Sequence, residues 1–211
     1  MDARELAVEG ALEILLPVHP DRRGLFCPLY EEADFADLPG GPFRAVRSGL
    51  SVNRRGVVRG VHYSPGTAEG PGAAKVVVCA AGEALDLVVD LREGSPTFGR
   101  SDSVPLDPRR PRAVYCPPGV GHAFLARAEG TVLLYLLSTP YRPGEERAVS
   151  ALDPALRLPV PLGPEPVLSD QDRGAPTLAQ ARERGLLPSY RPRTPPAGGA
   201  PGPSGRRRTE T

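Results

Sequence analysis

Residues 74–90 read AKVVVCAAGEALDLVVD, two apolar runs rich in β-branched residues on either side of Ala81-Gly82. This pattern predicts two strands joined as a hairpin by a two-residue turn, with Val77 opposite Asp86. Alternation along both strands then places a lysine and a carboxylate among valines on one face. That face consists of Lys75, Val77, Asp86 and Val88.

Two interpretations of this face stay open. Charged residues are seldom placed on a core-facing surface, and the other face is apolar throughout, so the charged face could point to solvent. In a sandwich whose interior binds a ligand, it would instead point inward. The apolar face comprises Val76, Val78, Leu85, Leu87 and Val89.

Short apolar or alternating stretches of the same kind recur along the chain between Gly, Pro and Asp/Asn clusters. Many short strands at this spacing predict an all-β sandwich or barrel. Helical patterns are limited to 31–38 and 177–187, the second opened by Thr177 as an N-cap. Alternating βαβ units, GxGxxG and GxxxxGK[ST] are all absent, which excludes a Rossmann fold. The strand-like stretches are ELAVEGALEILLPV, GLFCPLY, FRAVRSGLSV, GVVRGVHYS, AAKVVVCAA, EALDLVVDLR, AVYCPP, HAFLARA and TVLLYLLSTPY.

The chain has 211 residues and a formal net charge of +1, which gives no support to a nucleic-acid or membrane binder. It lacks a run of about 18 apolar residues, and its acidic start lacks the apolar core of a signal peptide, so we expect a cytoplasmic protein. Residues 191–211 are rich in Pro, Gly and Arg and predict a disordered tail. Residues 1–190 are expected to form one domain.

Rare residue types stand out in the composition. Lys75 is the only lysine among 26 basic residues, and Ile14 and Asn53 are also single occurrences. A lysine that survives where arginine is otherwise used is a candidate for a task that arginine cannot perform, although chance survival on the surface is equally compatible with the composition. The three cysteines show no CxxC spacing and predict free, partly buried thiols.

The three histidines, His19, His62 and His122, show no His-x-His spacing, and the position two after His62 is Ser64. The clustered ligands of a metal-binding cupin are therefore missing, and no metal is expected. No GxSxG elbow supports a Ser-His-Asp hydrolase. A strand histidine is usually structural, but beside a buried carboxylate it would form a general base near neutral pH.

Seven motifs follow one another along the chain: DRRGLF (21–26), VVRGVHY (57–63), AK (74–75), ALDLVVDLREGSPTFG (84–99), PPGVGHAF (117–124), LLYLLSTPY (133–141) and LSDQDRGAPTL (168–178). Taken together, this ordered series resembles the dTDP-4-dehydrorhamnose 3,5-epimerase family over roughly residues 5–188. Within the family the chain looks most similar to the branch that serves deoxysugars of actinobacterial natural products, where the ending GLLPxY recurs.

The resemblance implies a metal-free cupin, a jelly roll of the double-stranded β-helix type, which forms a homodimer with exchanged strands. It implies dTDP-4-keto-6-deoxyhexose substrates and no cofactor. By resemblance, His62 is the general base and Asp172 its carboxylate. Lys75 lies beside the C4 oxygen of the sugar, Tyr135 returns a proton from the opposite face, and His122 contacts the sugar.

The resemblance also implies a set of substrate-binding positions. Arginines grip the diphosphate, and the other members contact the nucleotide or the sugar. The set consists of Arg23, Phe26, Arg47, Ser51, Arg59, His122, Tyr141 and Glu146.

Three departures from the family pattern fall at nucleotide or sugar positions. Pro28 replaces a glutamate, Arg47-Ser48-Gly49 replaces Gln-Asp-Asn, and Gln171 replaces a lysine. They bear on the identity of the sugar and on double epimerisation. Spacing raises a separate question, because Arg59 and His62 are three residues apart and an ideal strand would point them to opposite faces. A bulge between them, or one wrong assignment, would resolve it.

The resulting hypothesis is a cofactor-independent epimerase that inverts C5, or C3 and C5, next to a C4 ketone. Removing either proton gives an enolate, whose O4 charge an ammonium can stabilise. The alternatives are a C3-only epimerase, a ketoisomerase on the same scaffold and a non-catalytic sugar-nucleotide-binding cupin.

Overall fold

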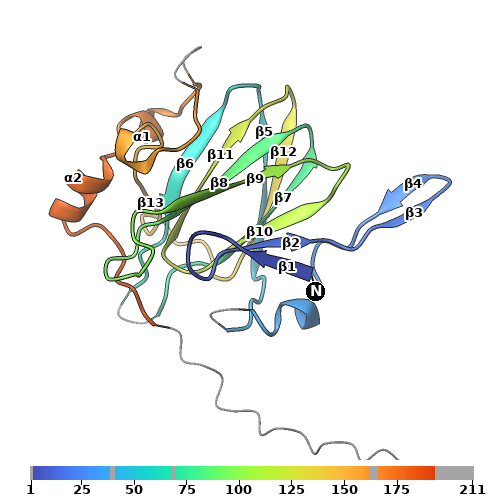
Figure 1. Cartoon of the computed structure of the whole chain (residues 1–211), viewed down its shortest axis with the longest axis horizontal. Helices are drawn as coiled ribbons and strands as arrows, with labels where there is room; N and C mark the ends of the chain where they lie inside the picture. The colour runs from blue at the N-terminus through green and yellow to red at the C-terminus, as the bar shows by residue number, and fades with distance from the viewer. Residues whose placement is uncertain (1, 39–40, 68–69, 162–165, 193–211) are drawn as a thin grey trace, which may run out of the picture.

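The computed structural model describes residues 2–38, 41–67, 70–161 and 166–192. Two sheets of antiparallel strands face each other in this part of the chain (Figure 1). The larger sheet contains, in spatial order, β1 (Asp2–Glu5), β2 (Leu12–Leu15), β10 (Arg112–Cys116), β7 (Lys75–Ala81), β12 (Thr131–Leu137) and β5 (Arg47–Asn53). The smaller sheet contains β13 (Arg147–Ala148), β6 (Val58–Tyr63), β11 (Val120–Ala126), β8 (Ala84–Asp90) and β9 (Ser101–Leu106).

The remaining elements are short. Strands β3 (His19–Asp21) and β4 (Gly24–Phe26) form a two-stranded arm that extends away from the sandwich (Figure 1). The predicted helix at 177–187 is present as α2 (Leu178–Glu183), and Thr177 caps it in a reciprocal capping box with Gln180. The helix predicted at 31–38 shrinks to a 3₁₀ turn. The other short helices are η1 (Glu32–Phe35), η2 (Pro154–Leu156) and α1 (Asp170–Arg173).

The central strands of both sheets bury both faces, and three apolar clusters result. The first lies between the sheets and includes Val77, Val88 and Phe124. The second covers the outer face of the smaller sheet, where the C-terminal segment around α2 packs on it. The third covers the outer face of the larger sheet beneath the segment that contains η1. Burial on both faces explains why strands such as β7 and β8 are almost continuously apolar in sequence.

The predicted hairpin at 74–90 is wrong, although its faces are right. Strand β7 pairs with β10 and β12, whereas β8 pairs with β11 and β9 in the other sheet. The chain changes sheets at Gly82, whose φ of +74° suits glycine and where an added Cβ would lie 2.6 Å from Oγ1 of Thr131. Lys75 and Asp86 are therefore both buried between the sheets, facing inward from opposite walls. The interior interpretation of the charged face is the one that the structure supports.

Other predictions have mixed outcomes. The three cysteines are free, as expected. No helix in the described part of the chain has the length and apolar character of a membrane span. The predicted tail at 191–211 lies, from residue 193 onward, outside the described residues, so its disorder stays a prediction.

Candidate active site

The smaller sheet contributes a histidine–carboxylate pair. Nε2 of His62 on β6 lies 2.6 Å from Oδ1 of Asp172 in α1. Ser169 caps α1 by accepting a hydrogen bond of 3.1 Å from the Asp172 amide, which fixes the carboxylate at the start of the helix. The Asp172 side chain is 3% exposed and that of His62 is 25% exposed, so the imidazole is the member of the pair that a ligand can reach.

Burial alone would raise the pKa of the Asp172 carboxyl. The hydrogen bond from His62, its charge, and the contacts of Ser169 and the Gly60 amide outweigh that effect and hold the pKa below its usual range. Asp172 is therefore a carboxylate at neutral pH. A buried carboxylate at this distance favours the imidazolium that forms when the histidine accepts a proton.

A β-bulge settles the spacing of Arg59 and His62. Between β6 and β11, Arg59 lies opposite Phe124 and His62 opposite His122, so three steps on one strand match two on the other. The irregularity falls at Gly60, which has a φ of +116° and has the carbonyl oxygen of His122 2.5 Å from the position of an added Cβ. The close approach leaves room for glycine alone. Of the two explanations that the spacing left open, the bulge is the one that is present.

The larger sheet contributes the lone lysine. Lys75 opens β7, and its side chain is 7% exposed. Its Nζ donates a hydrogen bond of 3.2 Å to Oε1 of Glu146, in the loop before β13. Burial would raise the pKa of Glu146, but the charges of Lys75, His62 and Arg47 and the hydrogen bond from Lys75 lower it overall. Within the described residues, the one ion pair of this ammonium is with Glu146, whose side chain is 51% exposed.

Tyr135 on β12 points into the same interior. Its hydroxyl lies 3.2 Å from Oγ of Ser51 on β5, and burial raises its pKa to about 12, more than the Ser51 hydrogen bond and the Arg59 charge lower it. Its ring meets that of His122 edge to face, with 6.2 Å between centroids. The phenol therefore keeps its proton at neutral pH and remains a potential acid.

A second histidine–carboxylate pair lies deeper. Nε2 of His122 on β11 is 2.7 Å from Oδ2 of Asp86 on β8, and both side chains are almost completely buried. Burial raises the pKa of Asp86, although His122 and Lys75 both favour its charged form. The other oxygen of Asp86, Oδ1, is buried and has no hydrogen-bond partner within the described residues. Asp86 was placed on the correct face from sequence but was not among the predicted site residues, because its pairing with His122 depends on register between distant strands.

The predicted residues at the edge of the interior also come together. The guanidinium of Arg47, at the start of β5, lies 5.1 Å from the ring centroid of Tyr141. Its charge also acts on Glu146, which connects this pair to Lys75. Arg59 donates from Nε to Oδ1 of Asn53 at 2.9 Å. Asn53 is a second site residue that the sequence did not predict, and its single occurrence was the only hint.

Two residues that were predicted to bind substrate, Arg23 and Phe26, lie away from this site in the same chain. Arg23 and Phe26 belong to the β3–β4 arm, where the Arg23 side chain is 85% exposed and Phe26 is 67% exposed. Arg23 pairs with Asp21 of the same arm. Figure 1 shows the arm on the far side of the larger sheet from α1 and α2.

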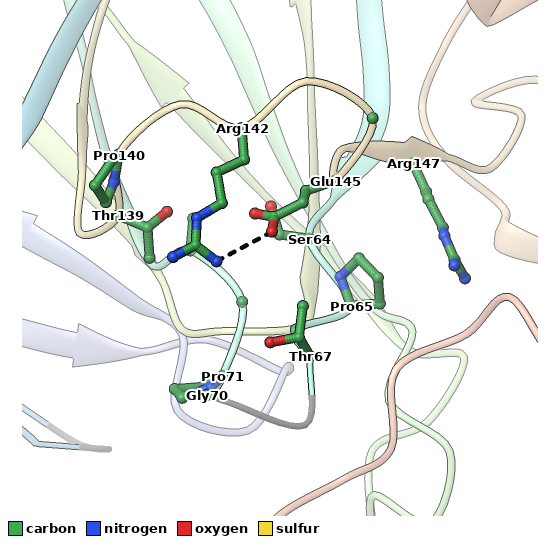
Figure 2. A pocket seen from close by; sticks show the side chains of 14 residues that line it. Ser64, Pro65, Thr67, Gly70, Pro71, Thr139, Pro140, Arg142, Glu145 and Arg147 are labelled. Carbon is green, nitrogen blue, oxygen red and sulfur yellow. Dashed lines mark hydrogen bonds and ion pairs between the residues drawn. The ribbon is translucent and has the colours of Figure 1, made fainter.

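A cavity of about 410 Å³ borders the site without containing it (Figure 2). It is lined by residues of 64–67 and 70–73 on one side and of the loop 139–147 on the other, and within that loop Arg142 and Glu145 form an ion pair at 3.3 Å. Tyr141 and Glu146 belong to one of these loops but do not line the cavity. The candidate site is therefore the interior between the sheets.

The described residues contain no group of three or more His, Cys, Asp or Glu side chains arranged to hold a metal ion. The site is instead an acid–base constellation with two walls. His62 belongs to the smaller sheet, and Asp172 pairs with it from α1. Lys75 and Tyr135 belong to the larger sheet.

A two-sheet antiparallel sandwich with these titratable side chains between its sheets defines a cupin-type fold with a polar interior. Residues 5–180 match the family described as dTDP-4-dehydrorhamnose 3,5-epimerase. The dTDP-4-dehydrorhamnose 3,5-epimerase of Mycolicibacterium smegmatis is 43% identical over 190 residues, which cover 90% of this chain and 92% of that protein. The chain therefore belongs to the dTDP-4-dehydrorhamnose 3,5-epimerase family.

Solved structures agree with this assignment and confirm the predicted fold. One is a 4-keto-6-deoxy sugar epimerase from the novobiocin biosynthetic gene cluster of Streptomyces spheroides, with a TM-score of 0.83, 43% identity and coverage of 90% of this chain and 94% of that one. Another is a 3'-monoepimerase of Streptomyces bikiniensis in complex with dTDP-quinovose, with a TM-score of 0.82, 43% identity and coverage of 88% and 92%. The predicted similarity to relatives from natural-product pathways is thereby confirmed.

Proposed function

We propose that this chain epimerises a dTDP-4-keto-6-deoxyhexose at C5, or at C3 and C5, in the biosynthesis of a natural-product deoxysugar. The observation that carries the proposal is the placement of His62 and Tyr135 on opposite sheets. Inversion of a carbon requires that a proton leave from one face and return on the other. A base on one wall and an acid on the facing wall meet that requirement.

In the proposed first step, His62 accepts the proton from the carbon next to the ketone. Asp172, held as a carboxylate, stabilises the resulting imidazolium. The electron pair moves into the ring and becomes an enolate with its charge on O4. Lys75 donates to that oxygen from the opposite wall.

The Lys75 ammonium suits this role because it is buried and compact. A donor aimed at a developing oxyanion in a water-poor site is typically worth about 3 kcal/mol of activation barrier. The fork of an arginine would spread its charge over a wider area than a single oxygen presents. The hydrogen bond from Nζ to Glu146 uses one of the three ammonium protons and leaves two for substrate.

In the proposed second step, Tyr135 donates its proton to the carbon from the other face, and the enolate returns to the ketone. Only protons and electron pairs within the substrate move, so we propose that no cofactor or metal takes part. Elemental analysis of the purified protein tests the metal prediction directly.

We propose that the nucleotide and diphosphate bind at the edge of the interior, where Arg47, Arg59, Tyr141 and Glu146 lie. Arg23 and Phe26 cannot join them in the same chain. A homodimer would resolve this, with the β3–β4 arm of each copy reaching the site of the other. The outward side chains of the edge strand β5 support such contact, because Leu50 is 61% and Val52 is 65% exposed.

The test is ¹H NMR in D₂O with dTDP-4-keto-6-deoxyglucose and its 2- and 3-deoxy analogues. Loss of the H-5 signal, or of H-3 and H-5, with appearance of the epimer would support the proposal. No exchange with any of these substrates in folded protein would contradict it, and tight binding without exchange would favour a non-catalytic binding protein.

A C3-only epimerase is the second candidate function. It is favoured by the Streptomyces bikiniensis relative, which is described as a 3'-monoepimerase and is as similar in sequence as the 3,5-epimerases. The same spectrum separates the two, because a C3-only enzyme would leave the configuration at C5 unchanged. Migration of the carbonyl would instead indicate a ketoisomerase.

A further inference from the structure

A partly buried hydrogen-bond chain lies behind Tyr135 and ends at Arg59. Its members are Ser51 and Asn53, which are two residues apart on β5 and therefore share a face. Asn53 is 2% exposed and is the only asparagine in the sequence. A buried amide that satisfies all of its hydrogen-bonding groups fixes the orientation of whatever it contacts.

The partners of Asn53 determine which way its amide faces. Oδ1 lies 2.9 Å from Nε of Arg59, which can only donate. Nδ2 lies 3.0 Å from the carbonyl oxygen of Thr131, which can only accept. Reversing the amide would break both contacts, so the NH₂ group must face Thr131 and, at 3.0 Å, Oγ of Ser51.

This orientation makes Ser51 Oγ an acceptor, and it leaves the direction of the next hydrogen bond to the serine hydrogen. Because Ser51 Oγ accepts from Asn53, its own hydrogen is available for Tyr135, whose oxygen lies 3.2 Å away. A phenol oxygen that accepts from Ser51 leaves its own hydrogen to point at the substrate. After that hydrogen has been donated, Ser51 already faces the phenolate as a donor.

We propose that Asn53 is a positioning residue for the return of the proton, acting through Ser51 on the hydroxyl of Tyr135. The inference rests on the proposed epimerase function. Since the same amide accepts from Arg59, it also couples the proton donor to a side chain proposed to bind the diphosphate. The hydrogen bond from Ser51 and the charge of Arg59 both lower the pKa of Tyr135, although burial raises it by more. Both influences agree with this chain of contacts.

The decisive variant is Asn53→Asp, which has nearly the same shape and still accepts from Arg59. A carboxylate cannot donate to Ser51, so the serine hydroxyl turns toward position 53 and away from Tyr135. We expect inversion to slow about tenfold, as for loss of one hydrogen bond, while deuterium exchange started by His62 is retained. The measured quantity is the ratio of exchange to inversion by ¹H NMR in D₂O.

Ser51→Ala removes the same donor without adding a charge and keeps the test available if Asn53→Asp does not fold. It should raise the exchange-to-inversion ratio as well. Ser103→Ala, the same change at a half-buried serine of β9, is the matched control and should leave the ratio unchanged. In a Tyr135→Phe background, which should exchange without inverting, Asn53→Asp should have no further effect on the rate of exchange.

Equal loss of exchange and inversion, or no change in the ratio for either variant, would overturn the inference and leave Asn53 as a structural residue. Failure of the proposed function has a different signature. Wild-type protein would then show neither exchange nor inversion, and the inference would fail with it.

Discussion

Nε2 of His62 and Oδ1 of Asp172 are 2.6 Å apart, although 110 residues separate them in the sequence. The carboxylate is held by the cap of a four-residue helix, and the imidazole lies next to a β-bulge. Both devices orient the histidine toward the interior between the sheets. The pair is the basis of the first prediction.

Asp172→Asn should lower kcat for exchange by roughly 100-fold, because the amide cannot stabilise the imidazolium as a carboxylate does. KM should change little, which steady-state kinetics would show.

The pH dependence of stability should change too in Asp172→Asn. Since folding lowers the pKa of Asp172, its contribution is present above the ordinary value of 3.8 and is lost as pH falls through the lower folded value. Thermal unfolding of the variant should therefore depend less on pH in that acidic range.

Tyr135→Phe should keep deuterium exchange but lose inversion, because His62 can still remove a proton while the facing wall has no acid. The readout is the same NMR spectrum, which resolves exchange from epimer formation. Tyr30→Phe, a tyrosine whose hydroxyl bonds to the backbone outside the interior, is the control and should invert normally. Normal inversion by Tyr135→Phe would mean that another group is the acid.

Lys75→Arg should give a folded protein with kcat reduced by about 100-fold, corresponding to loss of one donor to the enolate oxygen. The side chain is 7% exposed, so the wider guanidinium has little room to present a single charge to O4. Thermal unfolding close to that of wild type would establish that the loss is catalytic. Full activity of Lys75→Arg would contradict this role and would favour the alternative that the single lysine is present by chance.

Gly60→Ala should destabilise the protein by about 3 kcal/mol, since a Cβ there meets a backbone oxygen at 2.5 Å and the φ of +116° is unfavourable for alanine. Gly49→Ala on β5 is the matched control, because an added Cβ there meets nothing within 4 Å. Urea unfolding of both variants tests this. Equal stabilities would show that the bulge tolerates a side chain.

The sequence was sufficient to predict the faces of the strands but not their partners. Alternation correctly grouped Lys75 with Val77 and Asp86 with Val88, because parity along a strand does not depend on what it pairs with. The hairpin was wrong since Gly82 can serve a turn within a sheet or a crossing between sheets equally well. Strand β9 was not predicted because it is polar and contains Pro105, which an edge strand tolerates.

The same limit applies to the site. Motif resemblance identified His62, Lys75, Tyr135 and Asp172, and the structure brings them into one interior. Their roles remain predictions. Asp86 could not be deduced, because it pairs with His122 from a strand that is distant in sequence. Asn53 could not be deduced either, because its effect depends on the contact between its neighbour Ser51 and Tyr135 of a distant strand. Arg23 and Phe26 show the converse case, in which residues predicted for the site lie on an arm that does not reach it.

The most direct test of the central claim is the initial rate of deuterium uptake next to the C4 ketone, measured by ¹H NMR for wild type and for His62→Ala. We predict uptake at C5, or at C3 and C5, with wild type, and none with folded His62→Ala. Uptake by His62→Ala at the wild-type rate would contradict the account, because the proton would then be leaving to a different base.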